Sequence, residues 1–302
     1  MIIVAAPDLD QLLVEPVKLP SRLAAALARS EVRSIQRPAW ASELVVDQPV
    51  SVAPLTRLLD RPDDCQGIWL RADPVRLTPD LNAVWMTPGA ALEADHALTK
   101  ELPDLFGDSD LRFDLPHPER GYLTLASVPD CRFVPPDELE GQSLDHVLPS
   151  GPDARFWRRL LNECQIIAHQ HVRESGADGP GGLWFWGPGS LPASTGLAPR
   201  VQRLVGRDPI WAALARWLNL DHTAALADSS ALADASLAEW LADVSVDRAA
   251  NLAAFDAWLK PLWRRIRLGK LDALEIASRT RVWRLTPKAA WRFWRASGVA
   301  AT

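Results

Sequence analysis

The pattern of apolar and polar positions along the chain predicts a mixed α/β fold. Residues 2–6 and 67–70 are short apolar runs that end at polar residues or proline, as buried strands do. Leu19, Leu23 and Leu27 instead recur every four residues, which indicates a helix opening after Pro20. By the same reasoning we expect strands at residues 44–46, 122–126 and 183–186 and two more within 271–285, and helices at 88–102, 209–218, 237–242, 248–267 and 287–296.

The second half of the chain is the more helical. Residues 153–171 place Phe156, Leu160 and Ile167 on one stripe that a helix would bury. The clearest break, LPSGP at residues 148–152, precedes this segment. We therefore expect an acidic α/β portion at residues 1–150 and a helix-rich basic portion at 151–302, although the break can equally be a connection inside one continuous domain. The sheet is expected to be mixed, with helices on both faces.

Charge is distributed unevenly between these portions. Residues 1–150 hold 13 Lys and Arg against 24 Asp and Glu, whereas residues 151–302 hold 20 against 14. This asymmetry fits a basic surface for nucleic acid or a phosphorylated ligand, or two halves of one body that attract each other. We favour attraction between the halves, because the acidic first half would repel DNA.

Several features predict a cytoplasmic protein without a membrane partner. No apolar run approaches the roughly 18 residues that cross a bilayer, and the N-terminus lacks the basic region of a signal peptide. Cys65, Cys131 and Cys164 are widely spaced and form no C-x-x-C pair, as expected of reduced thiols rather than a disulfide framework or zinc site.

The sequence predicts no catalytic set, metal site or cofactor. His169 and His171 lie in a helical pattern, where side chains two apart point about 200° from each other and cannot share an ion. The acidic run at residues 104–110 lacks the order of a calcium loop. No G-x-S-x-G elbow or phosphate-binding P-loop occurs in the sequence.

Two groups of polar residues are candidates for a ligand site. Arg71 and Asp73 stand at the end of an expected strand, where α/β proteins gather their sites, although an Asp-Pro turn explains them equally well. Asn162, Gln165 and His169 share a helix face that either lines a groove or is simply solvated.

Aromatic residues supply further candidates. Trp184 and Trp186 alternate along a strand and face one side of it, either as core or as a wall for a ligand. Gly187 and Gly189 then leave room for a close approach of backbone, as the floor of a site requires. The region from Trp258 to Trp294 interleaves tryptophan with arginine and lysine, which suits nucleic acid or arginine stems covering buried indoles; we expect the latter.

Short motifs along most of the chain carry a resemblance to a known family. They are LRADPV at 70–75, LPSGPD at 148–153, WRRLLNECQ at 157–165, HQH at 169–171, LWFWGPG at 183–189, LW at 262–263, LGKL at 268–271 and WRFWR at 291–295. Together they resemble the RpfE-type regulatory proteins of Xanthomonas-like bacteria, which are often labelled phosphoglycerate mutases. A further local similarity to archaeal-type, cofactor-independent phosphoglycerate mutases implies a partly alkaline-phosphatase-like fold.

The resemblance does not carry the mutase activity to this chain. Such enzymes need a Ser or Thr nucleophile and two metals held by several Asp and His residues. Here the first strand leads to Pro7-Asp8-Leu9-Asp10, without the Asp-Gly start or a following nucleophile. Arg76 also stands where relatives have His, and residues 172–182 diverge from the family pattern.

We therefore expect a cytosolic regulatory or small-anion-binding protein of the RpfE type without mutase chemistry. The alternatives are a metal-dependent phosphoglycerate mutase or phosphatase-like enzyme, and a nucleic-acid-binding protein that uses the basic C-terminus. The expected partner is a small anion or another protein, and the oligomeric state stays open. The expected site gathers Arg71, Asp73, Asn162, Gln165, His169, Trp184, Trp186, Gly187 and Gly189.

Overall fold

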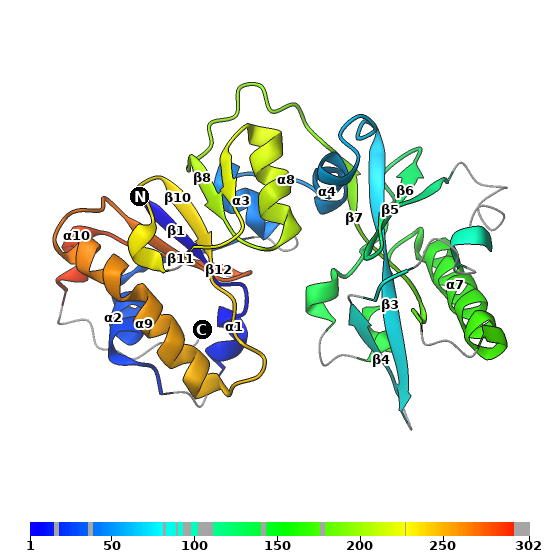
Figure 1. Ribbon diagram of the computed structural model, residues 1–302, viewed down its shortest axis with the longest axis horizontal. Helices are drawn as coiled ribbons and strands as arrows, with labels where there is room; N and C mark the ends of the chain where they lie inside the picture. The colour runs from blue at the N-terminus through cyan, green and yellow to red at the C-terminus, as the bar shows by residue number, and fades with distance from the viewer. Residues whose placement is uncertain are drawn as a thin grey trace. The chain divides into compact units, whose positions relative to one another are not determined.

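The chain folds into two compact units in the computed structural model (Figure 1). Unit 1 comprises residues 1–49 and 194–302, and unit 2, residues 50–193, is inserted between them. The structure describes all residues except 15–17, 36–38, 81–82, 89, 93–97, 102–110, 140–142, 176–178, 227 and 293–302. The sequence break at residues 148–152 lies inside unit 2, because the helix that follows it shares a buried apolar cluster with strand residues that precede it, such as Leu70 and Leu123.

Unit 1 is built on a seven-stranded sheet in the order β2-β12-β11-β1-β10-β8-β9. The central strand β1 pairs in parallel with β10 and β11, and β8 and β9 continue the parallel part, while β12 and β2 close the other edge in antiparallel orientation. The strands are β1 (Ile2–Ala5), β2 (Glu31–Ser34), β8 (Arg203–Val205), β9 (Asp221–Thr223), β10 (Ser236–Glu239), β11 (Leu274–Ala277) and β12 (Arg281–Leu285).

Both faces of the central strands of unit 1 are covered. Ile2 and Val4 belong to an apolar cluster with residues of α2 and α9, and these two helices pack together. Ile3 and Leu237, which point to the other face, are fully buried as well. The helices of unit 1 are α1 (Leu9–Leu12), α2 (Ser21–Arg29), α3 (Trp40–Val46), α8 (Pro209–Leu218), α9 (Arg248–Arg267) and α10 (Pro287–Ala290), with a 3-10 turn, η2, at Ser229–Ala231.

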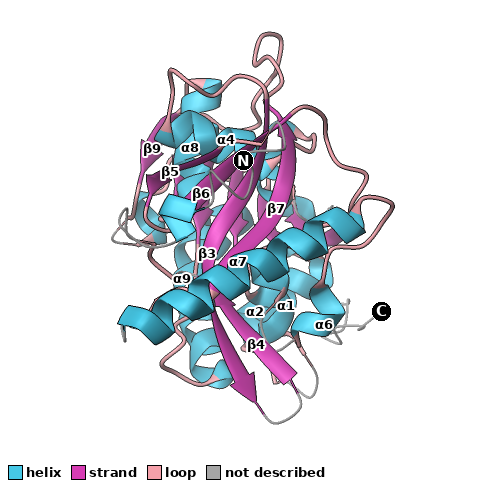
Figure 2. Ribbon diagram, turned by 90° about the vertical axis from the view of Figure 1, so that its right-hand side faces the viewer, coloured by secondary structure: helices cyan, strands magenta, loops and turns pink. Residues whose placement is uncertain are grey.

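Unit 2 contains an antiparallel sheet organised around the long strand β3. The first residues of β3 pair with β6 and its last residues with β4, while β7 runs along its length and β5 extends the sheet from β6. Helix α7 crosses this sheet (Figure 2). The elements are α4 (Val52–Asp60), β3 (Ile68–Asp80), β4 (Ala83–Pro88), β5 (Phe113–His117), β6 (Arg120–Leu125), η1 (Pro136–Glu138), α6 (Leu144–Val147), α7 (Ala154–Ser175) and β7 (Gly182–Ser190).

The predicted α/β class with a mixed sheet is confirmed, and most elements lie close to where the pattern placed them. Two predictions are wrong. Residues 44–46 belong to helix α3, because their short apolar run is one buried face of a helix that begins at Trp40. Residues 237–242 do not form a helix, because Ser236–Glu239 is the strand between β1 and β8. The helix expected at 88–102 is wrong at its start, because Pro88 ends strand β4 and residues 90–92 are not helical, while residues 93–97 and 102 lie outside the described residues. The helix expected at 287–296 ends at Ala290, and residues 293–296 lie outside the described residues.

Within the part of the chain that the structure describes, no helix is both long enough and apolar enough to cross a bilayer. The longest described helices, α7 and α9, each contain four arginines, and α9 buries one face, formed by residues such as Leu252, Phe255 and Leu259.

Candidate functional site

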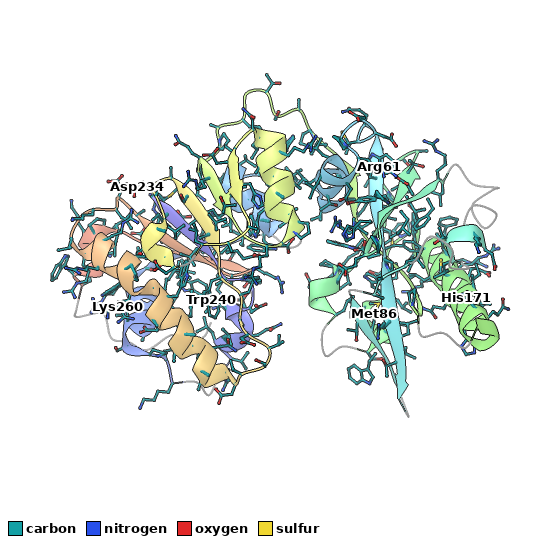
Figure 3. The ribbon with its side chains drawn as sticks, in the orientation of Figure 1. Arg61, Met86, His171, Asp234, Trp240 and Lys260 are labelled. Carbon is teal, nitrogen blue, oxygen red and sulfur yellow. The ribbon has the colours of Figure 1, made fainter. Side chains whose placement is uncertain are left out.

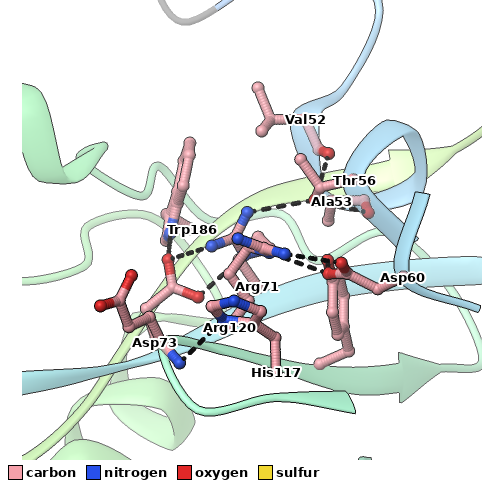
Figure 4. Close-up of polar contacts among 11 residues, drawn as sticks. Val52, Ala53, Thr56, Asp60, Arg71, Asp73, His117, Arg120 and Trp186 are labelled. Carbon is pink, nitrogen blue, oxygen red and sulfur yellow. Dashed lines mark hydrogen bonds and ion pairs between the residues drawn. The ribbon is translucent and has the colours of Figure 1, made fainter. Parts of the chain in front are cut away.

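The structure brings Arg71, Asp73 and Trp186 together on one face of the unit 2 sheet (Figure 4). Arg71 Nε and Nη2 each donate to the Asp73 carboxylate at 2.8 Å, and the Trp186 indole N–H donates to Asp73 Oδ2 at 2.7 Å. Arg71 Nη1 donates to the hydroxyl of Thr56 on α4 at 3.1 Å. Burial raises the pKa of Asp73, while the charge of Arg71 opposes that shift.

A second ion pair lies beside the first. Arg120 donates to both oxygens of Asp60 at 2.9 and 2.7 Å, and the Tyr122 hydroxyl donates to Asp60 at 2.6 Å. The Tyr122 ring lies 5.5 Å from the guanidinium carbon of Arg71, which links the two pairs. Burial alone would raise the pKa of Asp60, but the bonds from Arg120 and Tyr122 and the charge of Arg71 hold it below its usual value.

These contacts give Arg71 and Asp73 a role inside the protein. Arg71 is 6% exposed, and its donors are directed to Asp73 and Thr56. Pro74 lies within β3, so Asp73 does not cap an Asp-Pro turn. A bidentate pair of this kind fixes the packing of α4 on β3 and β7, and it leaves little of the guanidinium for an external anion.

The polar face of α7 is not part of this cluster. Asn162 and His169 are exposed, and α7 packs on the sheet through Trp157, whose ring lies 5.5 Å from that of Phe185. Phe185 faces away from the Arg71 side, because its neighbour Trp186 lies opposite Arg71 in the register. Gln165 packs against the backbone of Gly182.

The two tryptophans of β7 are core residues with different partners. Trp184 lies opposite Asp73 and Trp186 lies opposite Arg71, so the two tryptophans face the same side of the sheet, as their alternation along the strand predicts. Trp184 is 1% exposed, and its indole N–H donates to the carbonyl of Val134 at 2.8 Å. A ring this deeply buried has no free face for a ligand.

The glycine turn accommodates the protein's own backbone. Gly187 has φ +63°, in the left-handed region, and the pairing of β3 with β7 shifts register at this point. A Cβ on Gly189 would lie 2.2 Å from Ser51 Oγ, immediately before α4. Gly187 and Gly189 therefore let α4 pack closely on β7. The space that we expected a ligand to use is occupied by this helix of unit 2.

A second candidate is a cavity at the carboxyl ends of β8, β9 and β10, where parallel sheets commonly bind ligands. It has a volume of about 220 Å³, and Glu239, Trp240 and Trp258 are among the residues that line it. Glu239 accepts hydrogen bonds from the Trp211 indole at 2.8 Å and from the backbone N–H of Arg207 at 2.8 Å. This carboxylate thus occupies the place beside α8 that an anion would otherwise take.

The described carboxylates at this edge of the unit 1 sheet bind groups of the chain itself and form no two-metal centre of the kind that mutase chemistry needs. Asp8 accepts a hydrogen bond from the backbone N–H of Ala242, and Asp10 accepts one from the Thr280 hydroxyl. Glu239 accepts one from the Trp211 indole. Only one of the six histidines of the sequence, His222, belongs to unit 1. Among the described residues, no three His, Cys, Asp or Glu side chains are close enough to hold a metal ion. The residues at this edge therefore do not fit a two-metal centre.

A third candidate is a basic groove between α2 and α9, with a volume of about 750 Å³. Five cationic side chains and two indoles line it, and among the described residues no carboxylate does. We call this cavity the α2–α9 groove; it is lined by Ser21, Arg22, Ala25, Arg29, Lys260, Trp263, Arg264, Arg267, Leu268 and Trp291.

Comparison with known proteins identifies distant relatives. No family model matches the chain. It is 28% identical to the 2,3-bisphosphoglycerate-independent phosphoglycerate mutase of Methanosarcina mazei over 76 residues, 24% of this chain and 19% of that protein. It is 26% identical to the Methanosarcina barkeri enzyme over 113 residues, 34% and 28% of the two chains. It is 27% identical to a probable enzyme of the same name from Geobacter sulfurreducens over 135 residues, 40% and 33% of the two chains.

The chain is thus distantly homologous to cofactor-independent phosphoglycerate mutases, and the matches span a third or less of the length of those relatives. Among solved structures, the cofactor-independent phosphoglycerate mutase of Thermoplasma acidophilum has a TM-score of 0.42 at 13% identity, over 94% of this chain and 89% of that one. The PH0037 protein of Pyrococcus horikoshii has a TM-score of 0.43 at 10% identity, over 94% and 87% of the two chains.

Sequence reasoning missed the α2–α9 groove as a site. Its walls come from residues more than 230 positions apart, such as Arg22 and Lys260, so no local motif describes it. The tryptophan and arginine content of residues 258–294 did indicate a candidate site, but we expected these arginine stems to cover buried indoles.

Proposed function

We propose that the protein binds a small phosphate-bearing anion in the α2–α9 groove and does not perform metal-dependent mutase chemistry. The observation that carries this proposal is the charge of the groove: Arg22, Arg29, Lys260, Arg264 and Arg267 line it, and no carboxylate of the described part of the chain does. Phosphate groups are recognised by such clusters through charge-assisted hydrogen bonds. The resemblance to RpfE-type proteins supports a regulatory use of the bound ligand.

The charge of the two units supports a site in unit 1. Unit 1 carries 21 Lys and Arg against 16 Asp and Glu, whereas unit 2 carries 12 against 22. An anion is therefore attracted to the unit that contains the groove. The free thiols Cys65, Cys131 and Cys164 support the accompanying proposal of a reducing, cytosolic compartment.

Isothermal titration calorimetry of the full chain with inorganic tripolyphosphate tests the proposal. We expect saturable binding that weakens at least tenfold in Arg264→Glu, because the substitution reverses a charge in the groove wall. Arg216→Glu is the matched control, since Arg216 is likewise an exposed arginine in the last turn of a unit 1 helix. Equal affinity of both variants, or no binding by the wild type, would refute a phosphate site in the groove.

Homology to phosphoglycerate mutases favours a second candidate function, turnover of phosphoglycerate. Metal analysis of the purified protein, combined with an assay on 3-phosphoglycerate in the presence of Mn²⁺, separates the two functions. Two bound metal equivalents together with turnover would establish the enzyme. We expect neither, because the carboxylates described at the edge of the unit 1 sheet bind groups of the chain itself.

A further inference from the structure

The cations of the α2–α9 groove differ in how they are held. Arg22 binds the carboxylate of Asp256 at 2.6 Å. Arg29 Nη1 donates to the carbonyl of Ala290 at 2.7 Å, while its Nε is buried and has no hydrogen-bond partner. Arg22 and Arg29 are therefore held by groups of the chain itself, on the α2 side of the groove.

Three further cations of the groove, Lys260, Arg264 and Arg267, belong to α9, the helix on which Figure 3 labels Lys260. Lys260, Arg264 and Arg267 are exposed, and no carboxylate among the described residues lies within 4.0 Å of them. By contrast Arg265, on another side of the helix, is paired with Asp234 at 2.5 Å. The free positive charge of α9 is therefore concentrated on the side that lines the groove.

Two indoles lie among these cations. The guanidinium carbon of Arg29 is 5.9 Å from the centre of the Trp263 ring, and that of Arg267 is 4.2 Å from the centre of the Trp291 ring. Trp291 is 52% exposed, an unusual position for so large an apolar ring, and its N–H donates to the carbonyl of Arg267 at 3.1 Å. This bond orients the ring, so the groove presents a fixed aromatic surface beside free cations.

Fixed aromatic rings next to cations match a ligand that carries a planar ring and phosphates. A base stacks on indole or guanidinium, and phosphates bind arginine and lysine. The volume of about 750 Å³ lies in the range of small-molecule sites. Inorganic phosphate alone would leave the tryptophans unused.

The charge of the rest of the chain disfavours a polyanion as the ligand. Unit 2 has a net charge of −10, from 12 Lys and Arg against 22 Asp and Glu. Nucleic acid carries many phosphate charges and extends far beyond one groove, so this net negative charge disfavours it more than it disfavours a mononucleotide, which carries only a few phosphate charges.

From these contacts we propose that the α2–α9 groove is a nucleotide site, in which Trp291 or Trp263 stacks on the base and Arg264, Arg267 and Lys260 bind the phosphates. This inference rests on the proposed function and adds the aromatic half of the ligand. It assigns the two tryptophans a role that anion binding by itself does not need.

Calorimetry of the full chain with four probes tests the inference: ATP, tripolyphosphate, adenosine and a 20-nucleotide oligothymidylate. We expect ATP to bind at least tenfold more tightly than tripolyphosphate, and adenosine to bind weakly. If tripolyphosphate binds as well as ATP, the anion site stands and the nucleotide inference fails. If no probe binds, both fail. Oligothymidylate binding tighter than ATP, with a steep salt dependence, would replace the inference with a nucleic-acid site.

Two substitutions locate the stacking. Trp291→Ala is expected to weaken ATP binding about tenfold and to leave tripolyphosphate binding within about twofold, because stacking on an aromatic side chain is lost while the cations remain. Trp85→Ala is the matched control, since Trp85 is also an exposed tryptophan but lies on β4 of unit 2. Equal ATP affinity in wild type and Trp291→Ala, Trp263→Ala and the double variant would overturn the stacking role.

Discussion

Gly189 of β7 and Ser51, the residue that precedes α4, are so close that a methyl group on Gly189 would lie 2.6 Å from the Ser51 Cβ. This contact places α4 on the face of the sheet where Thr56 meets Arg71. The glycine motif thus serves the packing of unit 2, and the ion pairs beneath α4 depend on it. It follows that Gly189 tolerates a side chain only if Ser51 is altered as well.

Gly189→Ala is expected to destabilise unit 2 by about 1–3 kcal/mol, the usual cost of inserting a methyl group into a packed contact. Ser51→Gly should restore part of the loss, because it removes the clashing atoms and because glycine at a helix N-cap costs only a few tenths of a kcal/mol. Urea unfolding of the single and double variants measures both effects. If the losses in unfolding free energy of the two single variants simply add in the double variant, the predicted clash between a side chain at position 189 and Ser51 does not exist.

The Arg71–Asp73 pair is expected to be a structural feature of unit 2. Asp73→Ala should destabilise the protein by about 3–5 kcal/mol, since it leaves a buried guanidinium without its carboxylate. Replacing both residues, as Arg71→Met with Asp73→Leu, should cost less than the single change because no charge is left unpaired. Chemical denaturation checks the order of the two variants. A double variant less stable than Asp73→Ala would show that the attraction within the Arg71–Asp73 pair exceeds the free-energy cost of burying its two charges.

Asp60 should make stability depend on pH in the acid range. Its pKa is lower in the folded protein than the 3.8 of a free side chain, because Arg120 and Tyr122 hold the ionised form. The ionised carboxylate therefore stabilises the fold fully above about pH 4, and the contribution is lost as the pH falls through the lowered folded pKa. Urea midpoints between pH 7 and pH 2 should fall less steeply in Asp60→Asn than in wild type. Asp221→Asn, at an exposed pair, is the control and should follow the wild type.

The three thiols should differ in reactivity. Cys65 and Cys164 are buried, so neither thiol is accessible to a reagent in the folded protein, and burial also raises the pKa of Cys164 to about 12. Cys131 is half-buried, with a pKa raised by burial and by the charge of Asp153. A chromogenic disulfide reagent at pH 8 should titrate one thiol slowly in the native protein and three in urea. Cys131→Ser should abolish the reaction of the folded protein with the reagent. Rapid reaction of a second thiol in the folded protein would contradict the burial of Cys65 and Cys164.

The sequence predicted helices well where their ends are marked locally. Helix α8 begins at Pro209, after Asp208 caps the Ile210 N–H, and the predicted bounds agree with the structure. Strand β10 was missed because Ser-Leu-Ala-Glu has no strand signature of its own. Its position between β1 and β8 is what makes it a strand, so tertiary packing overrides the local preference.

The candidate site was predictable only in part. Alternation along β7 correctly placed Trp184 and Trp186 on one side, but the sequence does not reveal which side α7 covers. Asn162 and His169 were therefore grouped with Arg71, from which the sheet separates them. Their helix periodicity was correct; the missing information was the face on which the helix packs.

The insertion of unit 2 has a consequence for how the chain is made. Strand β1 is translated long before both of its neighbours, β10 and β11, which begin only at Ser236 and Leu274. Unit 2 lies between them in the sequence and can complete its sheet during translation, whereas the apolar Ile2–Ala5 segment waits unpaired until those strands have been synthesised. In the cell, β1 is therefore exposed to aggregation for longer than the strands of unit 2, and chaperone binding would protect it during that interval.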